Sequence, residues 1–404
     1  MGIFKIAWRN VWRNQRRTIV TIGAMSLALT VMILWAGLIE GYLEGMERNI
    51  LELEVGDLQI FANDYRDNPS IYTRIDQPDA LLSPLWKNGF DATARLLAFG
   101  MVAAGEASAG VSFRGVDIEQ DAEVSEIHRE VASGNWLDES DPSGVVIGRR
   151  LARILAVEVG SELVVLTQGA DGSMAYDLFT VRGILRGIGD ATDRGGVFLD
   201  VDVLRELIVV PGGVHQIIVR RPEGIELGTA EQMVRDLAGD NDVKTWRQLL
   251  PTLASLLDST RSLMVVMFVI VYVAIGILIL NAMLMAVFER VREFGVLKAI
   301  GAGPVDVMRL ILAECAIQTG LAVAIGVAIS IPSVAYLADT GLDIGSLAGV
   351  SIMGIAMDPL WKAVVSPYIF AMPIGVLLSI VVLAVLYPAL KAALIEPVEA
   401  MRHQ

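Results

Sequence analysis

Five charged side chains lie close together in the stretch FERVREFGVLKAIGA, residues 288–302: Glu289, Arg290, Arg292, Glu293 and Lys298. Carboxylates and guanidinium groups in one short segment can form charge-assisted hydrogen bonds with each other or with a partner protein. A helix turns by about 100° per residue, so these charges point in widely separated directions. Four apolar residues fall between them: Val291, Phe294, Leu297 and Ile300. A helix on a membrane surface would gather its charges on one side, so the pattern favours docking in a groove of another protein.

Residues that usually perform catalysis do not fall into a known motif. A P-loop places glycine directly before its lysine, and no lysine of this sequence follows a glycine. The acidic run DIEQDAE (117–123) is spaced like a calcium loop, but Ala122 replaces the required glycine and His128 the required glutamate. The sequence therefore predicts a non-catalytic chain that itself binds neither a metal nor a cofactor.

Apolar residues gather in four segments that are long enough to cross a membrane. A bilayer core about 30 Å thick requires roughly 20 apolar helical residues. The first segment has no charge in 22 residues and the second has none in 26. The predicted spans are 18–39, 263–288, 304–337 and 369–390. Before the third span, Gly301 and Gly303 are expected to end one helix and Pro304 to start the next.

The charges beside the first span give the predicted orientation. No acidic residue precedes this span, whereas five basic residues do: Lys5, Arg9, Arg13, Arg16 and Arg17. Three acidic residues follow it: Glu40, Glu44 and Glu47. Basic residues favour the cytoplasmic side, so residues 1–17 are predicted to be cytoplasmic. With four spans, 289–303 and 391–404 are then cytoplasmic, and 40–260 and 338–368 lie outside.

The external region 40–260 has the pattern of an α/β domain. Runs of β-branched or aromatic residues bounded by turn residues predict five strands: 57–61, 162–167, 176–185, 195–200 and 215–220. The second and third of these are expected to form a hairpin, and helical spacing is present in 148–157 and 229–240. Amphipathic extensions at both ends of the region predict helical stalks. Residues 40–257 contain 36 acidic and 19 basic residues, a net charge of −17, which argues against nucleic acid as a partner.

Polar residues are few in the predicted spans, and those we single out are Asn281, Glu314 and Gln318. Such groups are costly in lipid and are candidates for a functional role. Glu314 follows Pro304 by ten residues, or about 15 Å along a helix, which places it near the lipid headgroups. We therefore favour an interfacial charge over a functional one at Glu314.

Residues 289–302 resemble the cytoplasmic coupling helix of the permease subunits of type VII ABC transporters, the MacB, LolC/LolE and FtsX group. The positions that fit the pattern are Glu289, Arg290, Arg292, Glu293, Gly295, Leu297, Lys298, Ala299, Gly301 and Ala302. Three further stretches are similar to this family: 7–18, 145–166 together with 179–185, and 387–402. The resemblance covers essentially the whole chain.

The resemblance implies a fold and a set of partners. The expected fold is an α-helical membrane protein with four transmembrane helices and a large α/β periplasmic domain of the MacB type on helical stalks. In the family the permease dimerises, and each coupling helix docks on an ATPase subunit that binds ATP and Mg²⁺. The chain is expected in the bacterial inner membrane, surrounded by lipid and paired with a second copy or with a paralogue.

The resemblance also suggests roles for particular side chains. On the coupling helix, Phe294 and Leu297 are expected to enter a groove of the ATPase, and the charged residues around them are expected to orient the helix. A substrate cavity is expected between the first two spans of two copies. Its expected apolar lining is Met25, Leu29, Met32, Ile33, Met267 and Val271.

Three functions known in this family are open for the chain. The leading hypothesis is release of lipoproteins from the membrane to a periplasmic lipoprotein carrier, as in the LolC/LolE group. The second is export of a peptide or other periplasmic compound, as in the MacB group. The third is FtsX-like signalling, in which the permease activates a cell-wall hydrolase and transports nothing.

Overall fold

The computed structural model describes residues 2–343, 351–352, 355–356 and 360–394. The chain divides into two compact units. A helical unit is built from three stretches of the chain: 1–43, 257–344 and 360–404. An α/β unit is built from two: 44–256 and 345–359. Each unit contains its own hydrophobic core.

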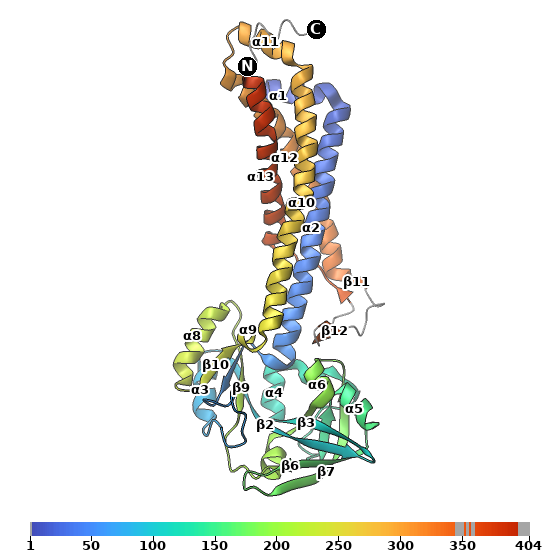
Figure 1. Ribbon diagram of the computed structural model, residues 1–404, viewed down its shortest axis with the longest axis vertical. Coiled ribbons are helices and arrows are strands. Elements are labelled where there is room, and N and C mark those ends of the chain that lie inside the picture. The colour runs from blue at the N-terminus through green and yellow to red at the C-terminus, as the bar shows by residue number, and fades with distance from the viewer. Residues whose placement is uncertain (1, 344–350, 353–354, 357–359, 395–404) are drawn as a thin grey trace. The chain divides into compact units, whose positions relative to one another are not determined.

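Four helices are long and apolar enough to cross a membrane, which confirms the predicted number of spans (Figure 1). They are α2 (Gln15–Ile50), α10 (Pro251–Glu289), α12 (Pro304–Thr340) and α13 (Pro367–Leu394). α2 has 36 residues and α10 has 39, so both are longer than the roughly 20 residues that a bilayer requires. Two short helices accompany them: α1 (Ile3–Val11), within the predicted basic segment, and α11 (Val291–Ala299).

Helices α2 and α12 pack closely in the helical unit. Leu29 is fully buried, and a Cβ added at Gly326 would lie only 3.0 Å from its side chain. The Thr30 hydroxyl donates to the Ser26 carbonyl at 2.9 Å and also lies 3.3 Å from the Gly326 carbonyl. Because Gly326 has no side chain, α12 can approach α2 at this point, and the residues of α2 that face it are enclosed.

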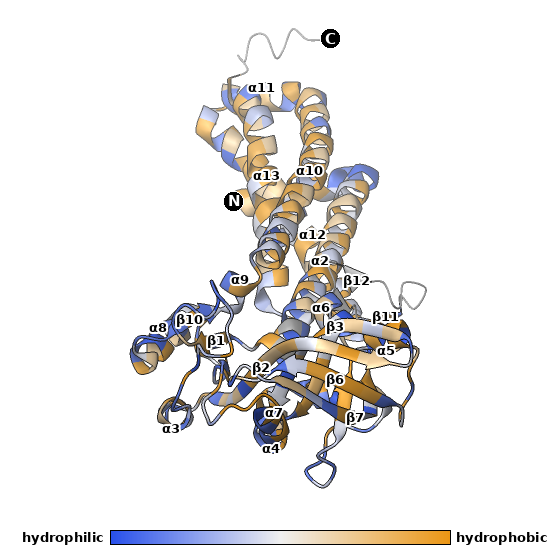
Figure 2. Cartoon of the chain, turned by 60° about the horizontal axis from the view of Figure 1, so that its bottom comes forward, coloured by the Kyte–Doolittle hydropathy of each residue, from blue (hydrophilic) through white to orange (hydrophobic). Residues whose placement is uncertain are grey.

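Six strands of the α/β unit pair into a closed ring (Figure 2). The pairing runs β2–β3–β8–β5–β7–β6 and returns to β2, because β6 pairs with both β7 and β2. The strands are β2 (Asp91–Ala104), β3 (Ala107–Val116), β5 (Gly144–Ile147), β6 (Glu162–Gln168), β7 (Met174–Leu185) and β8 (Gly196–Asp200). Side chains from all six contribute to one core, which includes Phe113, Val165 and Phe179.

A second sheet region continues from β2. β2 pairs with β9 (Gln216–Arg220), β9 pairs with β1 (Leu58–Phe61), and β1 pairs with β10 (Asp242–Thr245). Two helices contribute side chains to the core of this region: α3 (Asp79–Lys87) and α8 (Leu227–Ala238). The other elements of the α/β unit are α4 (Ile118–Val124), β4 (Val131–Gly134), α5 (Arg149–Leu155), α6 (Asp190–Gly195), α7 (Val201–Leu207), α9 (Trp246–Leu249), β12 (Ser351–Ile352) and β13 (Ile355–Ala356). The loop after α12 contains β11 (Leu342–Asp343) and β14 (Leu360–Trp361), which pair with each other.

The five strands and two helices predicted for the external region are confirmed, and the predicted hairpin is the antiparallel pair β6–β7. The sequence does not predict β2 and β3, which pair along ten positions, nor the short strands β4, β5 and β10. The acidic run 117–123 is a structural element. Asp117 caps α4 by accepting a hydrogen bond from the Gln120 backbone at 2.9 Å, and Asp121 accepts two from buried Arg95, at 2.7 and 2.9 Å.

Candidate functional site

Helix α11 carries the charged stretch, and glycine and proline set its C-terminal boundary. Beyond its end, Gly301 adopts a φ of 106°, a left-handed conformation that glycine enters at little cost. The Gly303 N–H donates to the Asp306 carboxylate at 3.0 Å, and Pro304 is the first residue of α12. The helix boundaries therefore follow the signals that the sequence contains.

The side chains of α11 and of Ile300, the residue that caps its C-terminus, divide into a buried and an exposed face. Phe294 is 1% exposed and belongs to the core of the helical unit, and Leu297 packs partly against that core. In contrast, Val296 and Ile300 are 49% and 77% exposed, and Arg292 is exposed as well. The prediction that Phe294 enters the groove of a partner is therefore wrong, because the chain's own helices bury this ring.

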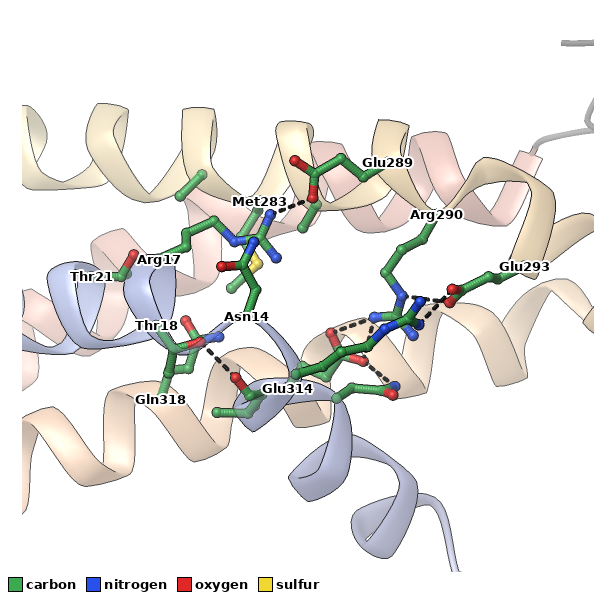
Figure 3. Close-up of a pocket in the computed structure, with 15 residues that line it drawn as sticks. Asn14, Arg17, Thr18, Thr21, Met283, Glu289, Arg290, Glu293, Glu314 and Gln318 are labelled. Carbon is green, nitrogen blue, oxygen red and sulfur yellow. Dashed lines mark hydrogen bonds and ion pairs between the residues drawn. The ribbon is translucent and has the colours of Figure 1, made fainter. Parts of the chain in front are cut away.

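Arg290 is the centre of an ion-pair network that joins α10, α11 and α12 (Figure 3). Its Nη1 donates to both carboxylate oxygens of Glu314, at 2.9 and 3.1 Å, and its Nε donates to Glu293 at 2.9 Å. The guanidinium also lies 5.3 Å from the centre of the Phe294 ring. The side chains of Arg290 and Glu314 are only 14% and 11% exposed. The guanidinium therefore contacts two carboxylates and one aromatic face, which together set its direction in this arrangement.

Three side chains from the N-terminal segment complete this network. Each donates a hydrogen bond to one of its carboxylates: Asn10 to Glu314 (2.6 Å), Arg13 to Glu293 (2.5 Å) and Arg17 to Glu289 (3.0 Å). In the sequence, the two arginines indicate the orientation of the chain, and nothing marks Asn10 as the partner of a distant carboxylate. Asn10 and Glu314 are 304 positions apart, so no local pattern could reveal their contact.

The network favours the ionised forms of Glu293 and Arg290. Burial alone would raise the pKa of Glu293, but hydrogen bonds from Arg290 and Arg13 outweigh burial and hold that pKa below its usual value. Burial also disfavours the charged form of Arg290, and the neighbouring carboxylates, Glu314 first, outweigh it and raise the pKa of the guanidinium. Removing one partner of such a pair leaves an uncompensated charge, which costs about 3–5 kcal/mol.

A cavity of about 220 Å³ lies beside the network. Besides the charged groups, its lining includes Asn14, Thr18, Thr21, Met283 and Gln318 (Figure 3). The arginines and carboxylates therefore have mostly polar neighbours and some room to change partners. Among the residues that the structure describes, no cluster of His, Cys, Asp or Glu could hold a metal ion.

The other predicted residues of the coupling helix act within the chain. Lys298 donates from Nζ to the Ala393 carbonyl at 2.6 Å, which ties α11 to α13, and burial lowers the pKa of the amine. Gly295 is buried. Glu314 is buried and is held by Arg290 and Asn10, and its expected depth near the lipid headgroups stays a prediction. The charges that were expected to orient the helix on a partner thus form their contacts inside the helical unit.

The residues predicted to line a substrate cavity do not share one surface. Met25, Leu29 and Ile33 are at most 1% exposed and lie in the core of the helical unit. They pack the chain's own helices, so the prediction is wrong for these three. The other three are partly buried or exposed and remain candidates for the lining: Met32, Met267 and Val271.

Two family models match the chain. The MacB-like periplasmic core domain matches residues 18–237, and the FtsX-like permease C-terminal domain matches residues 265–397. An uncharacterised ABC transporter permease of Methanocaldococcus jannaschii is 26% identical over 68% of this chain and 65% of that protein. The macrolide export ATP-binding/permease protein MacB of Hahella chejuensis is 26% identical over 56% of this chain and 33% of that protein. The lipoprotein-releasing system transmembrane protein LolC of Xylella fastidiosa is 22% identical over 74% of this chain and 75% of that protein.

The chain thus spans 65% of the length of the first of these relatives and 33% of the second. The model of the periplasmic core domain alone covers more than half of the chain, and the permease model covers the region of α11 and the helices around it. Four membrane-length helices and an α/β unit agree with both matches. The chain therefore belongs to the MacB/FtsX-like family of ABC transporter permeases.

Proposed function

We propose that this permease couples ATP hydrolysis by a separate ATPase chain to movement of its α/β domain. The observation that carries this proposal is the way α11 is anchored. Arg290 and Glu314 join α11 to α10 and α12, and Lys298 joins it to α13, so a force on this short helix reaches three membrane helices. The exposed side chains of Val296 and Ile300 offer an apolar contact to the ATPase.

The proposal places α11 and both ends of the chain in the cytoplasm and the α/β unit in the periplasm of a bacterium. The five basic residues ahead of the first span support this orientation in the inner membrane. ATP and Mg²⁺ then bind to the partner ATPase. The permease works as a dimer, either of two copies of this chain or of this chain and a paralogue.

We propose lipoproteins as the cargo, handed to a periplasmic carrier. The alignment with LolC of X. fastidiosa runs along about three quarters of both chains, and that relative is named for lipoprotein release. MacB of H. chejuensis is no less similar in identity, and the α/β unit matches the MacB-like model. Export of a peptide or other periplasmic compound is therefore the second candidate.

One face of the α/β unit suits contact with cargo or carrier. Large apolar side chains are exposed on the outside of the strand ring, on β2, β6 and β7: Phe99, Met101, Val164, Tyr176 and Leu178. Their rows are adjacent, because Met101 pairs with Leu166 and Leu166 pairs with Tyr176 (Figure 2). Contiguous exposed apolar surface of this kind often marks an interaction site.

The test is purification of the tagged full-length permease from native membranes in mild detergent, with identification of bound proteins by mass spectrometry. We expect an ABC ATPase in constant ratio to the permease, together with lipoproteins and a periplasmic carrier. An outer-membrane channel or adaptor in their place would support the export function. Absence of any ATPase would contradict the coupling function itself.

A matched pair of variants sharpens this test. Ile300→Asp places a charge at the exposed C-cap of α11 and should release the ATPase while the permease still folds. Val365→Asp changes an equally apolar, 59% exposed residue in the loop before α13, which is predicted to lie on the other side of the membrane. This control should retain the ATPase. Equal retention by both variants would show that α11 is only a connector.

A further inference from the structure

Helix α1 carries two stripes of exposed side chains that the proposed function does not use. Residues four apart lie on the same side of a helix. An aromatic stripe follows this spacing into the turn after α1: Phe4, Trp8 and Trp12. A basic stripe runs beside it, one position further along: Lys5, Arg9 and Arg13. The other side of α1 packs inward through Ala7 and Val11.

The two stripes meet in a shallow pocket. Its lining includes Lys5, Arg9 and Arg13 together with Trp8 and Trp12. The two indole rings contact edge to face, with their centres 6.0 Å apart, and form an apolar wall. In the described part of the chain, Lys5 and Arg9 have no acidic partner, whereas Arg13 pairs with an acidic residue of α11. The pocket thus presents two unneutralised cations beside an aromatic surface.

We propose that this pocket binds the headgroup of an anionic phospholipid, and that the bound lipid holds α11 in position. Ammonium and guanidinium groups donate strong hydrogen bonds to phosphate oxygens. Tryptophan favours the boundary between headgroups and acyl chains, and a helix with an aromatic and a basic side lies along that boundary. Only the turn Trp12–Asn14 separates α1 from the membrane-length helix α2, so the pocket lies where lipid headgroups are available.

A continuous set of contacts joins the pocket to α11. Asn10, between the two stripes and the buried side of α1, donates to Glu314, which in turn holds Arg290. Arg13 belongs to the basic stripe and also donates to Glu293 of α11. A lipid that fixes α1 therefore fixes two of the groups that hold α11. The control of α11 by the bound lipid rests on the proposed function, in which α11 receives force from an ATPase. The lipid site itself does not depend on that function.

The first experiment measures the lipid site on the full-length permease without its ATPase. The protein is reconstituted in phosphatidylcholine that contains a photoactivatable phosphatidylglycerol, and the labelled peptides are identified. Label is expected on residues 3–13. The double variant Lys5→Gln, Arg9→Gln should reduce it about 25-fold, since each basic residue near an anionic surface contributes about fivefold.

Controls for the lipid site separate it from general charge effects. Arg309→Gln removes another exposed arginine, near the start of α12, and should leave the labelling of residues 3–13 unchanged. Excess glycerol phosphate should not compete. Undiminished label in the double variant would overturn the proposed lipid site. Competition by glycerol phosphate would show that the ligand is a soluble phosphate compound and not a lipid.

The second experiment adds the ATPase and measures turnover in vesicles with and without phosphatidylglycerol. Phosphatidylglycerol should raise the turnover of wild type severalfold and should not raise that of the Lys5→Gln, Arg9→Gln variant, although the ATPase stays bound. Glu314→Gln should retain the lipid label and lose the rise, because the link to Arg290 is weakened. Equal turnover with and without phosphatidylglycerol in wild type would overturn the control of α11 by the bound lipid. If no ATPase binds, the proposed function fails while the labelling result still stands.

Discussion

Each unit of this permease contains a buried arginine–carboxylate pair, and the two pairs differ in what surrounds them. Arg95 and Asp121 are 1% and 2% exposed and join β2 to α4, elements close together in the sequence. Arg290 and Glu314 border a polar cavity, and each has a further partner. Asn10 donates to Glu314, and Arg290 donates to Glu293 of α11. The first pair is enclosed and fixes a fold. The second has polar neighbours with which it can exchange hydrogen bonds, as the proposed transmission of movement through α11 would require.

The largest expected effect comes from breaking the pair beside the cavity. Arg290→Ala leaves two carboxylates without their main partner and should destabilise the helical unit by about 3–5 kcal/mol. ATPase stimulation should be lost as well. The double variant Arg290→Met, Glu314→Leu should recover much of the stability, because apolar residues can replace a buried pair, but not the stimulation. Thermal unfolding in detergent and ATPase turnover measure the two effects separately.

The matched control replaces the pair in the α/β unit. Arg95→Met with Asp121→Leu should likewise retain stability, and turnover should stay at the wild-type value. If this variant lost stimulation as completely as the one beside the cavity, the two pairs would not differ in role.

The second prediction concerns the two faces of α11. Phe294→Ala removes a fully buried ring and should cost about 3–5 kcal/mol, whereas Ile300→Ala, at a 77% exposed position, should cost less than about 0.5 kcal/mol. Hydrogen exchange of α11 measured by mass spectrometry should rise only in the first variant. Equal exchange in both would mean that the Phe294 ring does not hold the helix.

The C-terminal end of α11 could be predicted from the sequence, but which of its faces is buried could not. Gly301, Gly303 and Pro304 act on the backbone locally, so their effect is readable in the sequence. Phe294 and Ile300 are both apolar, and helices distant in sequence decide which one is buried. The contact between Asn10 and Glu314 arises in the same way, since it joins residues 304 positions apart.

In the α/β unit, strands were predicted where β-branched and aromatic residues dominate. Residues 91–116, which form β2 and β3, are instead rich in alanine, glycine and serine, which have little preference for strands. They are held as strands by pairing with each other and with β6, β8 and β9. The ring of six strands was not predictable, because β2 and β3 carry so weak a signal and β5, although rich in valine, has only four residues.

The third prediction separates the units by pH. Burial lowers the pKa of His215 from 6.5 to about 4, and its Nδ1 accepts a hydrogen bond from the Leu97 N–H at 3.0 Å. Below pH 6.5 the unfolded chain binds a proton that the folded chain does not bind until about pH 4. Stability of the α/β unit should therefore be complete above this window and fall by about 3 kcal/mol across it.

The helical unit should respond differently in the same window. The pKa of Glu293 is lowered, so its contribution to the stability of the helical unit is complete above the usual pKa of glutamate. This contribution is lost only as the pH falls through the lowered pKa. Hydrogen exchange, corrected for its intrinsic pH dependence, should accelerate in β2 and β9 before it does in α11. His215→Gln should remove most of the pH dependence of β2 and β9. If hydrogen exchange accelerated first in α11, the helical unit and not the α/β unit would be the more sensitive to acid.

The smallest expected effect lies at the exposed edge of the network beside the cavity. Arg17 and Glu289 form an ion pair with side chains that are 30% and 47% exposed, and such pairs contribute about 0–1 kcal/mol. Arg17→Gln should therefore leave thermal unfolding almost unchanged and should lower ATPase stimulation only at low salt, because salt screens exposed charges. Turnover measured over a range of salt concentrations, for this variant beside Arg290→Ala, tests the difference. The loss in Arg290→Ala should persist at every salt concentration, since that pair is shielded from water. If Arg17→Gln lowered ATPase stimulation as much as Arg290→Ala, force would pass through the exposed pair of Arg17 and Glu289 rather than through Glu314. Burial would then not explain which charged residues are needed for stimulation.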